Sequence, residues 1–204
     1  MLTTFEGVPY KFVKISKYRL LNLNMAKQYK YINEKLQQFI KQQKIFFIGT
    51  AASDGRVNVS PKGMNSLHIK NENKVVWLNF TGSGNETAAH LLENDRMTIM
   101  FSAFEGAPLT LRLYGHAKIF HPRDTNWDSL ISLFSISIGA RQIIELDVDL
   151  VQTSCGGGVP RFDFREERQG LIEWANKKGT DGLQNYWQEK NQLSIDGKPT
   201  KINV

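Results

Sequence analysis

Alternation of hydrophobic and polar positions divides much of the chain into segments of strand length. The run at 45–51 is continuously apolar, whereas 56–60 alternates polar and apolar residues as a half-buried strand does. Further segments with one or the other pattern lie at 67–70, 75–80, 97–102, 109–120 and 142–153. Turn signals such as Ser53-Asp54-Gly55 and Asn71-Glu72-Asn73 separate neighbouring segments. The pattern predicts six or seven strands, joined mostly as consecutive hairpins.

Helical spacing of apolar positions occurs between some of these strands. Residues 28–43 place one apolar face together, formed by Tyr29, Ile32, Leu36, Phe39 and Ile40. Other predicted helices are 86–93, 125–134 with Thr125 or Asp124 as its cap, and 166–190 with a break near Gly179 to Gly182. A parallel, doubly wound fold would need a helix after almost every strand. We therefore expect a mainly β fold, an antiparallel sheet closed or nearly closed into a barrel with α-helices added.

Length and charge are those of an ordinary globular protein. We expect a single domain over 25–195 of the 204 residues, because Met25 opens a segment typical of a natural start. Residues 1–24 are expected to be an upstream extension or a disordered tail, and residues 196–204 a frayed tail. The extension supplies +3 of the net charge of +6, through Lys11, Lys14, Lys17 and Arg19 against Glu6. The other basic residues are scattered among acids, which suits an anionic cofactor as well as a polyanion.

Cysteine, histidine and hydropathy patterns narrow the compartment and the chemistry. Cys155 is the only cysteine, so no internal disulfide forms and a cytoplasmic location is expected. The sequence has no apolar run of about 18 residues, so no membrane span is predicted. The four histidines lack the spacing of metal ligands, and no metal is expected.

A glycine-containing loop, Gly82-Ser83-Gly84-Asn85-Glu86-Thr87, joins the strand at 75–80 directly to a helix. The first turn of a helix has free backbone N–H groups and the positive end of the helix dipole, so this junction suits a phosphate. Capping of the helix by Ser83 or Asn85 would explain the same residues without a ligand. Spacing alone does not choose between the two interpretations.

A polar strand precedes this junction by one hairpin. Arg56, Asn58 and Ser60 alternate along it and share one face, and Lys62 follows at its exit. Cationic and hydroxyl groups beside a helix N-terminus would form a phosphate site, whereas an exposed polar face is the alternative. The chain lacks the lysine of a triphosphatase loop and a dinucleotide fingerprint in a βαβ unit.

The two segments Arg56-Val57-Asn58-Val59-Ser60-Pro61-Lys62-Gly63 and Asn79-Phe80-Thr81-Gly82-Ser83-Gly84-Asn85-Glu86-Thr87-Ala88 resemble the pyridoxamine 5′-phosphate oxidase-related flavoproteins. The similarity continues through 101–106, 113–115, 139–142 and 152–156, and spans most of residues 26–195. It implies the FMN-binding split-barrel fold, and a homodimer with FMN at the subunit interface. The residues it implies for the cofactor are Arg56, Asn58, Ser60, Lys62, Phe80, Thr81, Ser83, Gly84, Asn85, Thr87, Arg141 and Gln142.

The sequence departs from the true oxidases of that family at two places. They carry Ser-Arg-Lys, with two cations on the phosphate, where this chain has Asn85-Glu86-Thr87. They also end in a Trp-Arg-x-Arg type segment that grips the pyridoxal substrate, in contrast to Ser194-Ile195-Asp196-Gly197-Lys198-Pro199 here. We therefore expect weaker FMN binding or a different cofactor preference. The resemblance predicts an FMN-dependent oxidoreductase of unassigned substrate and does not predict oxidation of vitamin B6.

Two other classes of function stay open at this point. A flavin- or haem-binding carrier or sensor would hold its cofactor without turnover, and haem would take His116 or His121 as an axial ligand. Nucleic-acid binding ranks last because the strand from Arg56 to Lys62 has no aromatic residue among its basic ones.

Overall fold

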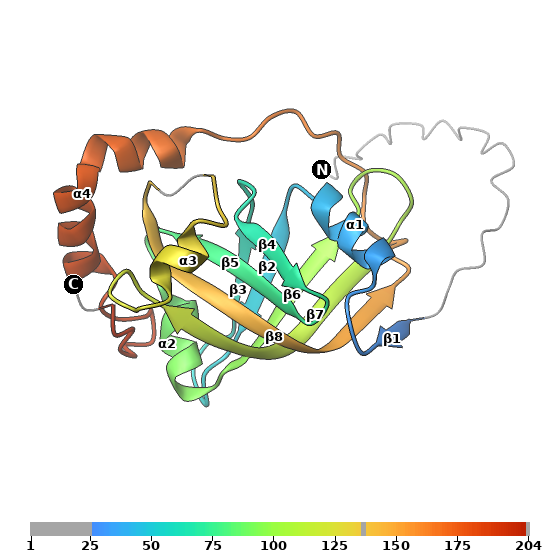
Figure 1. Ribbon diagram of the computed structural model, residues 1–204, viewed down its shortest axis with the longest axis horizontal. Helices are drawn as coiled ribbons and strands as arrows, with labels where there is room; N and C mark the ends of the chain where they lie inside the picture. Colours follow the sequence, from blue (N-terminus) through green and yellow to red (C-terminus); the bar gives the residue numbers. More distant parts are fainter. Residues whose placement is uncertain (1–25, 136–137, 203–204) are drawn as a thin grey trace, which may run out of the picture.

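The computed structural model of the protein describes residues 26–135 and 138–202 (Figure 1). The predicted extension at 1–24 lies outside these residues. The elements follow one another as β1 (Lys27–Tyr29), α1 (Glu34–Gln42), β2 (Phe46–Thr50), β3 (Asn58–Lys62), β4 (Leu67–Asn71), β5 (Lys74–Phe80), α2 (Glu86–Glu93), β6 (Arg96–Ser102), β7 (Thr110–Phe120), α3 (Trp127–Ile131), β8 (Ala140–Ser154) and α4 (Gly170–Lys190).

The strands form one curled antiparallel sheet. In the described part of the chain it has eight strands in the order β3-β2-β6-β7-β8-β5-β4, and β1 pairs with the far end of β8. Strands β3 and β4 are the two edges, so the barrel is split between them. The predicted fold class, a mainly β antiparallel split barrel, is confirmed, and the strand count exceeds the predicted six or seven because of β1.

Apolar side chains fill the inside of the curled sheet. Trp77, Ile99 and Leu146 come from three different strands and are at most 1% exposed, and Leu36 and Ile40 of α1 pack against them. A second cluster covers the outer face of β5 and β8, where α3 contributes Leu130. Because β5 and β8 are buried on both faces, their sequences are apolar over long runs rather than strictly alternating.

The helix predicted over 28–43 is wrong at its N-terminal end. Residues 27–29 pair with β8 instead, with Tyr29 opposite Val151. The helix begins only at Glu34, because the Asn33 side chain accepts a hydrogen bond from the backbone N–H of Leu36 at 3.1 Å. An N-cap of this kind fixes where a helix starts.

The other predicted helices are close to those observed. Helix α2 has its predicted bounds, and α4 contains the predicted break, at Gly179 with a φ of 65°. Helix α3 is shorter than predicted and begins after Asn126. Asp124 does not cap it, because its carboxylate accepts the backbone N–H of His121 at 2.8 Å.

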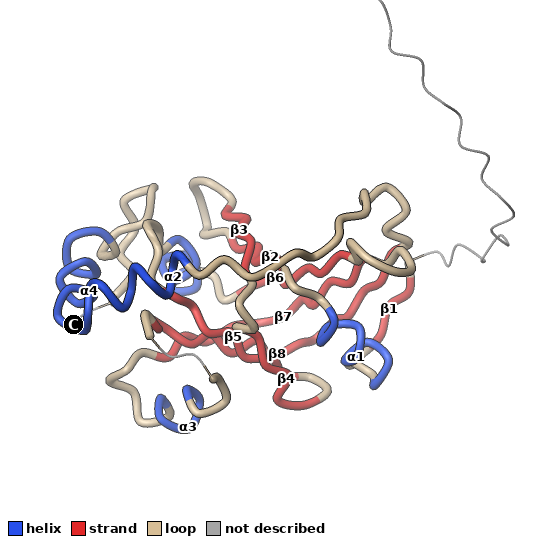
Figure 2. The backbone as a smooth tube through the Cα atoms, turned by 90° about the horizontal axis from the view of Figure 1, so that it is seen from above, coloured by secondary structure: helices blue, strands red, loops and turns tan. Residues whose placement is uncertain are grey.

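Residues 196–202 do not form the predicted frayed tail. Ile202 is 2% exposed and packs with Leu183 and Trp187 of α4, and Thr200 is fully buried. Figures 1 and 2 both place α4 at the same end of the sheet as α2, with α1 and β1 at the opposite end. The last described residues are therefore brought next to the glycine loop that precedes α2.

None of the helices in residues 26–135 and 138–202 combines the length with the hydropathy that crossing a membrane requires.

Candidate functional site

Strand β3 sorts its side chains between two environments. Asn58, Ser60 and Lys62 are half-buried on one face, whereas Val59 and Pro61 on the other face are exposed. A proline is tolerated here because β3 is an edge strand that pairs with β2 alone. The predicted alternation is confirmed for these three residues, which bring an amide, a hydroxyl and an amine to one place.

That face borders a cavity of about 530 Å³ between β3, β5 and the loop leading into α2. Its lining is formed by Arg56, Val57, Asn58, Val59, Ser60, Lys62, Trp77, Asn79, Phe80, Gly82, Ser83, Gly84, Asn85, Glu86, Thr87, Arg141 and Ile195. Ten of the twelve residues predicted for the cofactor are among them. The other two, Thr81 and Gln142, lie behind the wall and are at most 1% exposed.

The glycine loop has the predicted strand–loop–helix form, but neither predicted cap operates. Asn85 occupies the N-cap position of α2 without a side-chain cap bond. Its Nδ2 donates instead to the backbone oxygen of Asn191 at 3.3 Å, and its buried Oδ1 has no partner. The cap residue therefore leaves the first-turn N–H groups of α2 without a side-chain acceptor, which favours the anion-binding interpretation over simple capping.

Glu86 folds back over this loop. Its carboxylate lies close to the Cα of Gly84, so a Cβ on residue 84 would meet it unless the flexible Glu86 side chain moved. The Oε1 atom accepts a hydrogen bond from the backbone N–H of Ile195 at 3.4 Å. A carboxylate at the N-terminus of α2 stabilises the helix, but it also opposes a second anion at the same place.

Arg141 supplies a buried cation beneath the loop. Its Nη1 donates to the backbone oxygens of Gly82 and Gly84, at 3.4 and 3.0 Å, and to Oδ1 of Asn191 at 2.7 Å. The residue is 2% exposed, and its Nε has no hydrogen-bond partner. Burial lowers the pKa of Arg141 to about 10, so the guanidinium stays charged at neutral pH.

Lys62 supplies a second cation to the same cavity. Its Nζ lies 5.1 Å from the centre of the Trp77 ring, within cation–π range. Burial, and then repulsion from Arg141, lower the pKa of Lys62 to about 8, although Glu86 acts in the opposite direction. Neither Lys62 nor Arg141 has a carboxylate within ion-pair distance among the described residues.

Two like charges in one cavity disfavour each other unless an anion joins them. An anion placed between Lys62 and Arg141 would relieve the repulsion that, after burial, lowers the pKa of Lys62. With the N-terminus of α2 and the hydroxyl of Ser60, they border one cavity, and such groups can together bind an anion such as a phosphate.

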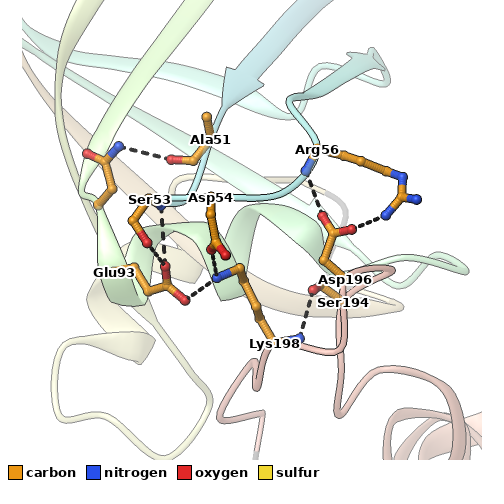
Figure 3. Close-up of polar contacts among 9 residues, drawn as sticks. Ala51, Ser53, Asp54, Arg56, Glu93, Ser194, Asp196 and Lys198 are labelled. Atoms are coloured by element: carbon orange, nitrogen blue, oxygen red, sulfur yellow. Dashed lines mark hydrogen bonds and ion pairs between the residues drawn. The ribbon is translucent and has the colours of Figure 1, made fainter.

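Arg56 does not take the role predicted for it, in which its charge faces the phosphate. Its guanidinium and backbone N–H both bind the Asp196 carboxylate, the second at 2.8 Å, and its side chain is 72% exposed (Figure 3). Gly55, in the turn before Arg56, has a φ of 92°, which favours glycine. A Cβ at this position would lie 2.7 Å from the Asp196 carboxylate, so the glycine also leaves room for it. Arg56 thus forms the rim of the cavity, with its charge already balanced.

Lys198 ties the C-terminal segment to the same rim. Its Nζ lies 2.6 Å from Asp54 and 2.7 Å from Glu93, and Glu93 also accepts the Ser53 hydroxyl at 2.7 Å (Figure 3). The hydrogen bond from Lys198, followed by that from Ser53, lowers the pKa of Glu93 to about 2. These contacts hold the segment that carries Ile195 at the mouth of the cavity.

The two predicted residues behind the cavity wall hold its elements together. Thr81 donates its hydroxyl hydrogen to the backbone oxygen of Gly139 at 2.9 Å and accepts the indole N–H of Trp187 at 2.8 Å. Gln142 accepts from Nδ2 of Asn79 at 3.1 Å, and its own Nε2 lies 3.3 Å from Nε2 of His121. Both residues position the lining and do not form it.

A polar cluster joins the polar strand to α2. The Nδ2 of Asn58 donates to Thr87 at 3.2 Å and to Thr50 at 3.3 Å, and Thr50 is hydrogen-bonded to Nδ1 of the buried His90 at 3.1 Å. Asn58 is thereby fixed in orientation at the cavity wall.

The sequence did not indicate three residues that shape the site: Trp77, Asn191 and Ile195. Trp77 belongs to an apolar strand, and its sequence context indicates a core residue. Asn191 is fully buried and binds three groups of the glycine loop and its cation, yet it lies 109 positions from Gly82. No local pattern marks a contact of that separation. Among the described residues, no group of three or more His, Cys, Asp or Glu is arranged to hold a metal.

Comparison with known families gives this arrangement a context. A family model described as pyridoxamine 5′-phosphate oxidase matches residues 32–155, more than half of the chain. The chain belongs to the pyridoxamine 5′-phosphate oxidase family. A curated member, the pyridoxamine 5′-phosphate oxidase family protein ustO of Aspergillus flavus, is 32% identical over 191 residues, covering 84% of this chain and 76% of that one.

Solved structures resemble this member of the pyridoxamine 5′-phosphate oxidase family more distantly. HutZ, described as the heme storage protein from Vibrio cholerae, is 17% identical, with a TM-score of 0.45 over 58% of this chain and 92% of its own. The FAD binding protein from Mycobacterium smegmatis is 11% identical, with a TM-score of 0.45 over 61% and 96%. Likenesses at this level do not indicate which ligand the family member binds.

Proposed function

We propose that the 530 Å³ cavity binds FMN through its phosphate and that the protein is an FMN-dependent oxidoreductase. One observation carries the proposal: Lys62 and Arg141 border one cavity, beside a helix N-terminus, without a carboxylate partner within ion-pair distance in the described residues. Membership of the pyridoxamine 5′-phosphate oxidase family supports a flavin as the molecule that carries the phosphate.

The residues present fit such a phosphate. Lys62 and Arg141 supply charge, and Ser60 and Thr87 supply hydroxyl groups at the lining. Backbone N–H groups at the start of α2 replace the paired cations that other family members carry in the loop. Because Glu86 remains beside the loop, the net positive charge facing the phosphate is small, and we expect moderate affinity.

When bound, FMN supplies the redox chemistry, and this chain's residues bind and orient it. Asn58, held by Thr50 and Thr87, presents a fixed amide to the cavity, and Trp77 and Phe80 supply aromatic surface. Lys62, with a pKa near 8, is able to exchange a proton close to neutral pH. Its amine is the group in this cavity best suited to follow a change in charge on a bound ligand.

A second copy of the chain is proposed to cover the cavity mouth. Val57 and Val59 on the edge strand and Ile195 on the C-terminal segment are 71%, 68% and 71% exposed. All three border the same cavity. Exposed apolar side chains grouped around a site favour contact with another protein surface, in line with a homodimer whose flavin lies at the interface.

Haem binding is not favoured by either histidine considered for it. His116 is exposed, with Nδ1 2.8 Å from Asp95 and Nε2 3.8 Å from Asp149. His121 is 8% exposed, and its Nε2 is hydrogen-bonded to Gln142. Neither histidine is among the residues that line the cavity of the proposed site.

Absorption and titration experiments test the proposal. The purified protein, or protein incubated with FMN, is expected to show the two-band spectrum of oxidised flavin, and mass spectrometry of the heat-released ligand should identify FMN. Riboflavin, which lacks the phosphate, should bind at least about ten-fold more weakly than FMN if the two cations hold the phosphate. Colourless protein that takes up no added FMN would overturn the proposal.

A further inference from the structure

Arg141 also borders a second cavity, of about 490 Å³, which has no part in the proposed flavin site. Its walls come from the turn after β7, the start of β8, the second half of α4 and the C-terminal segment. They are formed by His121, Pro122, Arg123, Ile138, Gly139, Ala140, Arg141, Thr180, Leu183, Gln184, Trp187 and Ile202. Apart from Gly139, Ala140 and Arg141, these residues lie outside the segments named above for the flavoprotein resemblance.

The walls of the second cavity combine an apolar side with positively charged residues. Leu183, Trp187 and Ile202 make one side apolar and are each at most 8% exposed. Two arginines border the space, Arg123 from the exposed turn and Arg141 from the buried floor, and the described residues that line it include neither Asp nor Glu. A cavity that combines apolar walls with cations and no acid suits a molecule with an apolar body and a negative charge.

The guanidinium of Arg141 has N–H donors that make no hydrogen bond within the described residues. Its Nη1 makes all three of its hydrogen bonds, to Gly82, Gly84 and Asn191. The Nε atom has no partner but is closed off from both cavities, whereas Nη2 makes no hydrogen bond to any described residue and is the donor left for a ligand. A guanidinium has five N–H donors in a planar fork that matches a carboxylate, and leaving them unmet in a buried place is unfavourable.

His121 does not supply a further positive charge to this cavity. Burial, and then Arg123, lower the pKa of its imidazole, while Asp124 acts in the opposite direction. Its Nε2 lies 3.3 Å from Nε2 of Gln142, whose amide can only donate, so this ring nitrogen is the acceptor of a neutral ring. Arg141 is therefore the buried charge that an anion in this cavity would meet.

We infer that this second cavity binds a small carboxylic acid with an apolar or aromatic body, with the carboxylate on Arg141 and the body against Leu183 and Trp187. The ligand would share its cation with the cavity of the proposed flavin site, since Arg141 borders both. Two anions that depend on one guanidinium weaken each other, and this coupling is reciprocal. The coupling rests on the proposed function, whereas binding to the second cavity does not.

Phenylacetate and its neutral analogue phenylacetamide provide matched probes. Isothermal titration of protein freed of flavin is expected to show phenylacetate binding at least about ten-fold more tightly than phenylacetamide, because only the first pairs with the guanidinium. Gln184→Glu places an acid at the exposed rim and should weaken phenylacetate at least about five-fold. Gln188→Glu adds the same charge to the same helix outside the cavity lining and should leave the affinity unchanged. Saturation with FMN should weaken phenylacetate about five-fold.

Four results would overturn the inference in different ways. Absence of phenylacetate binding removes the site, and equal binding of the two probes removes the role of charge. Binding that FMN abolishes but Gln184→Glu leaves intact places the probe in the first cavity. Equal phenylacetate affinity with and without bound FMN removes the shared role of Arg141. Protein that takes up no FMN would contradict the proposed function alone, because the titration of flavin-free protein still decides the second cavity.

Discussion

Lys62→Met is expected to make the ligand-free protein more stable and its binding of FMN weaker. Methionine keeps an unbranched stem against Trp77 and removes the positive charge. A residue that only supports the fold would lose stability when replaced, whereas a charge held ready for an anion destabilises the empty site. Opposite changes in stability and affinity are therefore the signature of a binding cation.

The pKa of Lys62 gives the size of the effect. A fall from 10.5 to about 8 corresponds to about 3 kcal/mol of free energy unfavourable to the charged form in the folded chain. The lost cation–π contact with Trp77, 5.1 Å away, offsets about 1 kcal/mol of this. The variant should gain about 1–2 kcal/mol at neutral pH, and loss of a charge-assisted bond to phosphate should weaken FMN binding roughly 10- to 100-fold.

The pH dependence has a definite sign. Because the pKa of Lys62 is lower in the folded chain than in the unfolded chain, the unfolded chain binds more protons between about 8 and 10.5. At neutral pH the charged Lys62 lowers the free energy of unfolding. As the pH rises through this window the amine loses its proton and that free energy increases, so the difference in stability between Lys62→Met and the parent disappears. FMN affinity of the unmodified protein should fall over the same window as the amine loses its charge, and that of the variant should not.

Urea unfolding followed by circular dichroism, together with FMN fluorescence titration, measures both effects at neutral and alkaline pH. Lys44→Met is the matched control, since Lys44 lies over the Phe164 ring at 5.3 Å and does not border the flavin cavity. It should leave FMN affinity unchanged. A Lys62→Met variant that is less stable than the parent and binds FMN equally well would refute the reasoning.

Three further outcomes follow from the same contacts. Glu86→Gln removes the acid beside the glycine loop and should tighten FMN about three- to ten-fold in a fluorescence titration, because repulsion of the phosphate is lost; weaker binding would contradict this. Asn191→Ala removes three side-chain hydrogen bonds and should lower the free energy of unfolding, measured in urea, by about 2–4 kcal/mol. The control, Asn185→Ala on the exposed side of α4, should lower it by no more than about 0.5 kcal/mol. The pKa of His121 is lowered in the folded protein, so the unfolded chain binds more protons below about 6.5 and stability is lost as the pH falls through the folded pKa. Thermal melting of His121→Gln should show a flatter acid limb, and an unchanged slope would show that another group titrates.

Local patterns were sufficient for much of the fold and for the polar side of the site. The strands were predictable because each buries one or both faces and therefore repeats with a period of two or runs continuously apolar. The half-buried face of Asn58, Ser60 and Lys62 followed from the same alternation. Helix α2 and the glycine loop before it were marked by glycines and by the end of an apolar run.

Other features depend on partners distant in the sequence. Strand β1 exists because residues 27–29 reach the far end of β8, and its three residues are too few to show a period. Arg56 has the residue type of a phosphate ligand, yet Asp196 binds it across 140 positions. Gln142 and Thr81 carry polar groups of the expected kind, but the buried partners Asn79 and Gly139 turn them away from the cavity.

The contacts of α4 and the segment after it have a consequence for the order of events during synthesis. Trp187 is hydrogen-bonded to Thr81, just before the glycine loop, and Asn191 to Gly82 within it, across 106 and 109 positions. Contacts of such separation form late, because a long stretch of chain must be closed before they are made. The barrel strands can pair while the C-terminal residues are still being added, but the loop reaches its final shape only afterwards. Insertion of a phosphate-bearing cofactor is thus expected as a post-translational step, and hydrogen exchange at residues 187–202 should report directly on whether the cofactor is present.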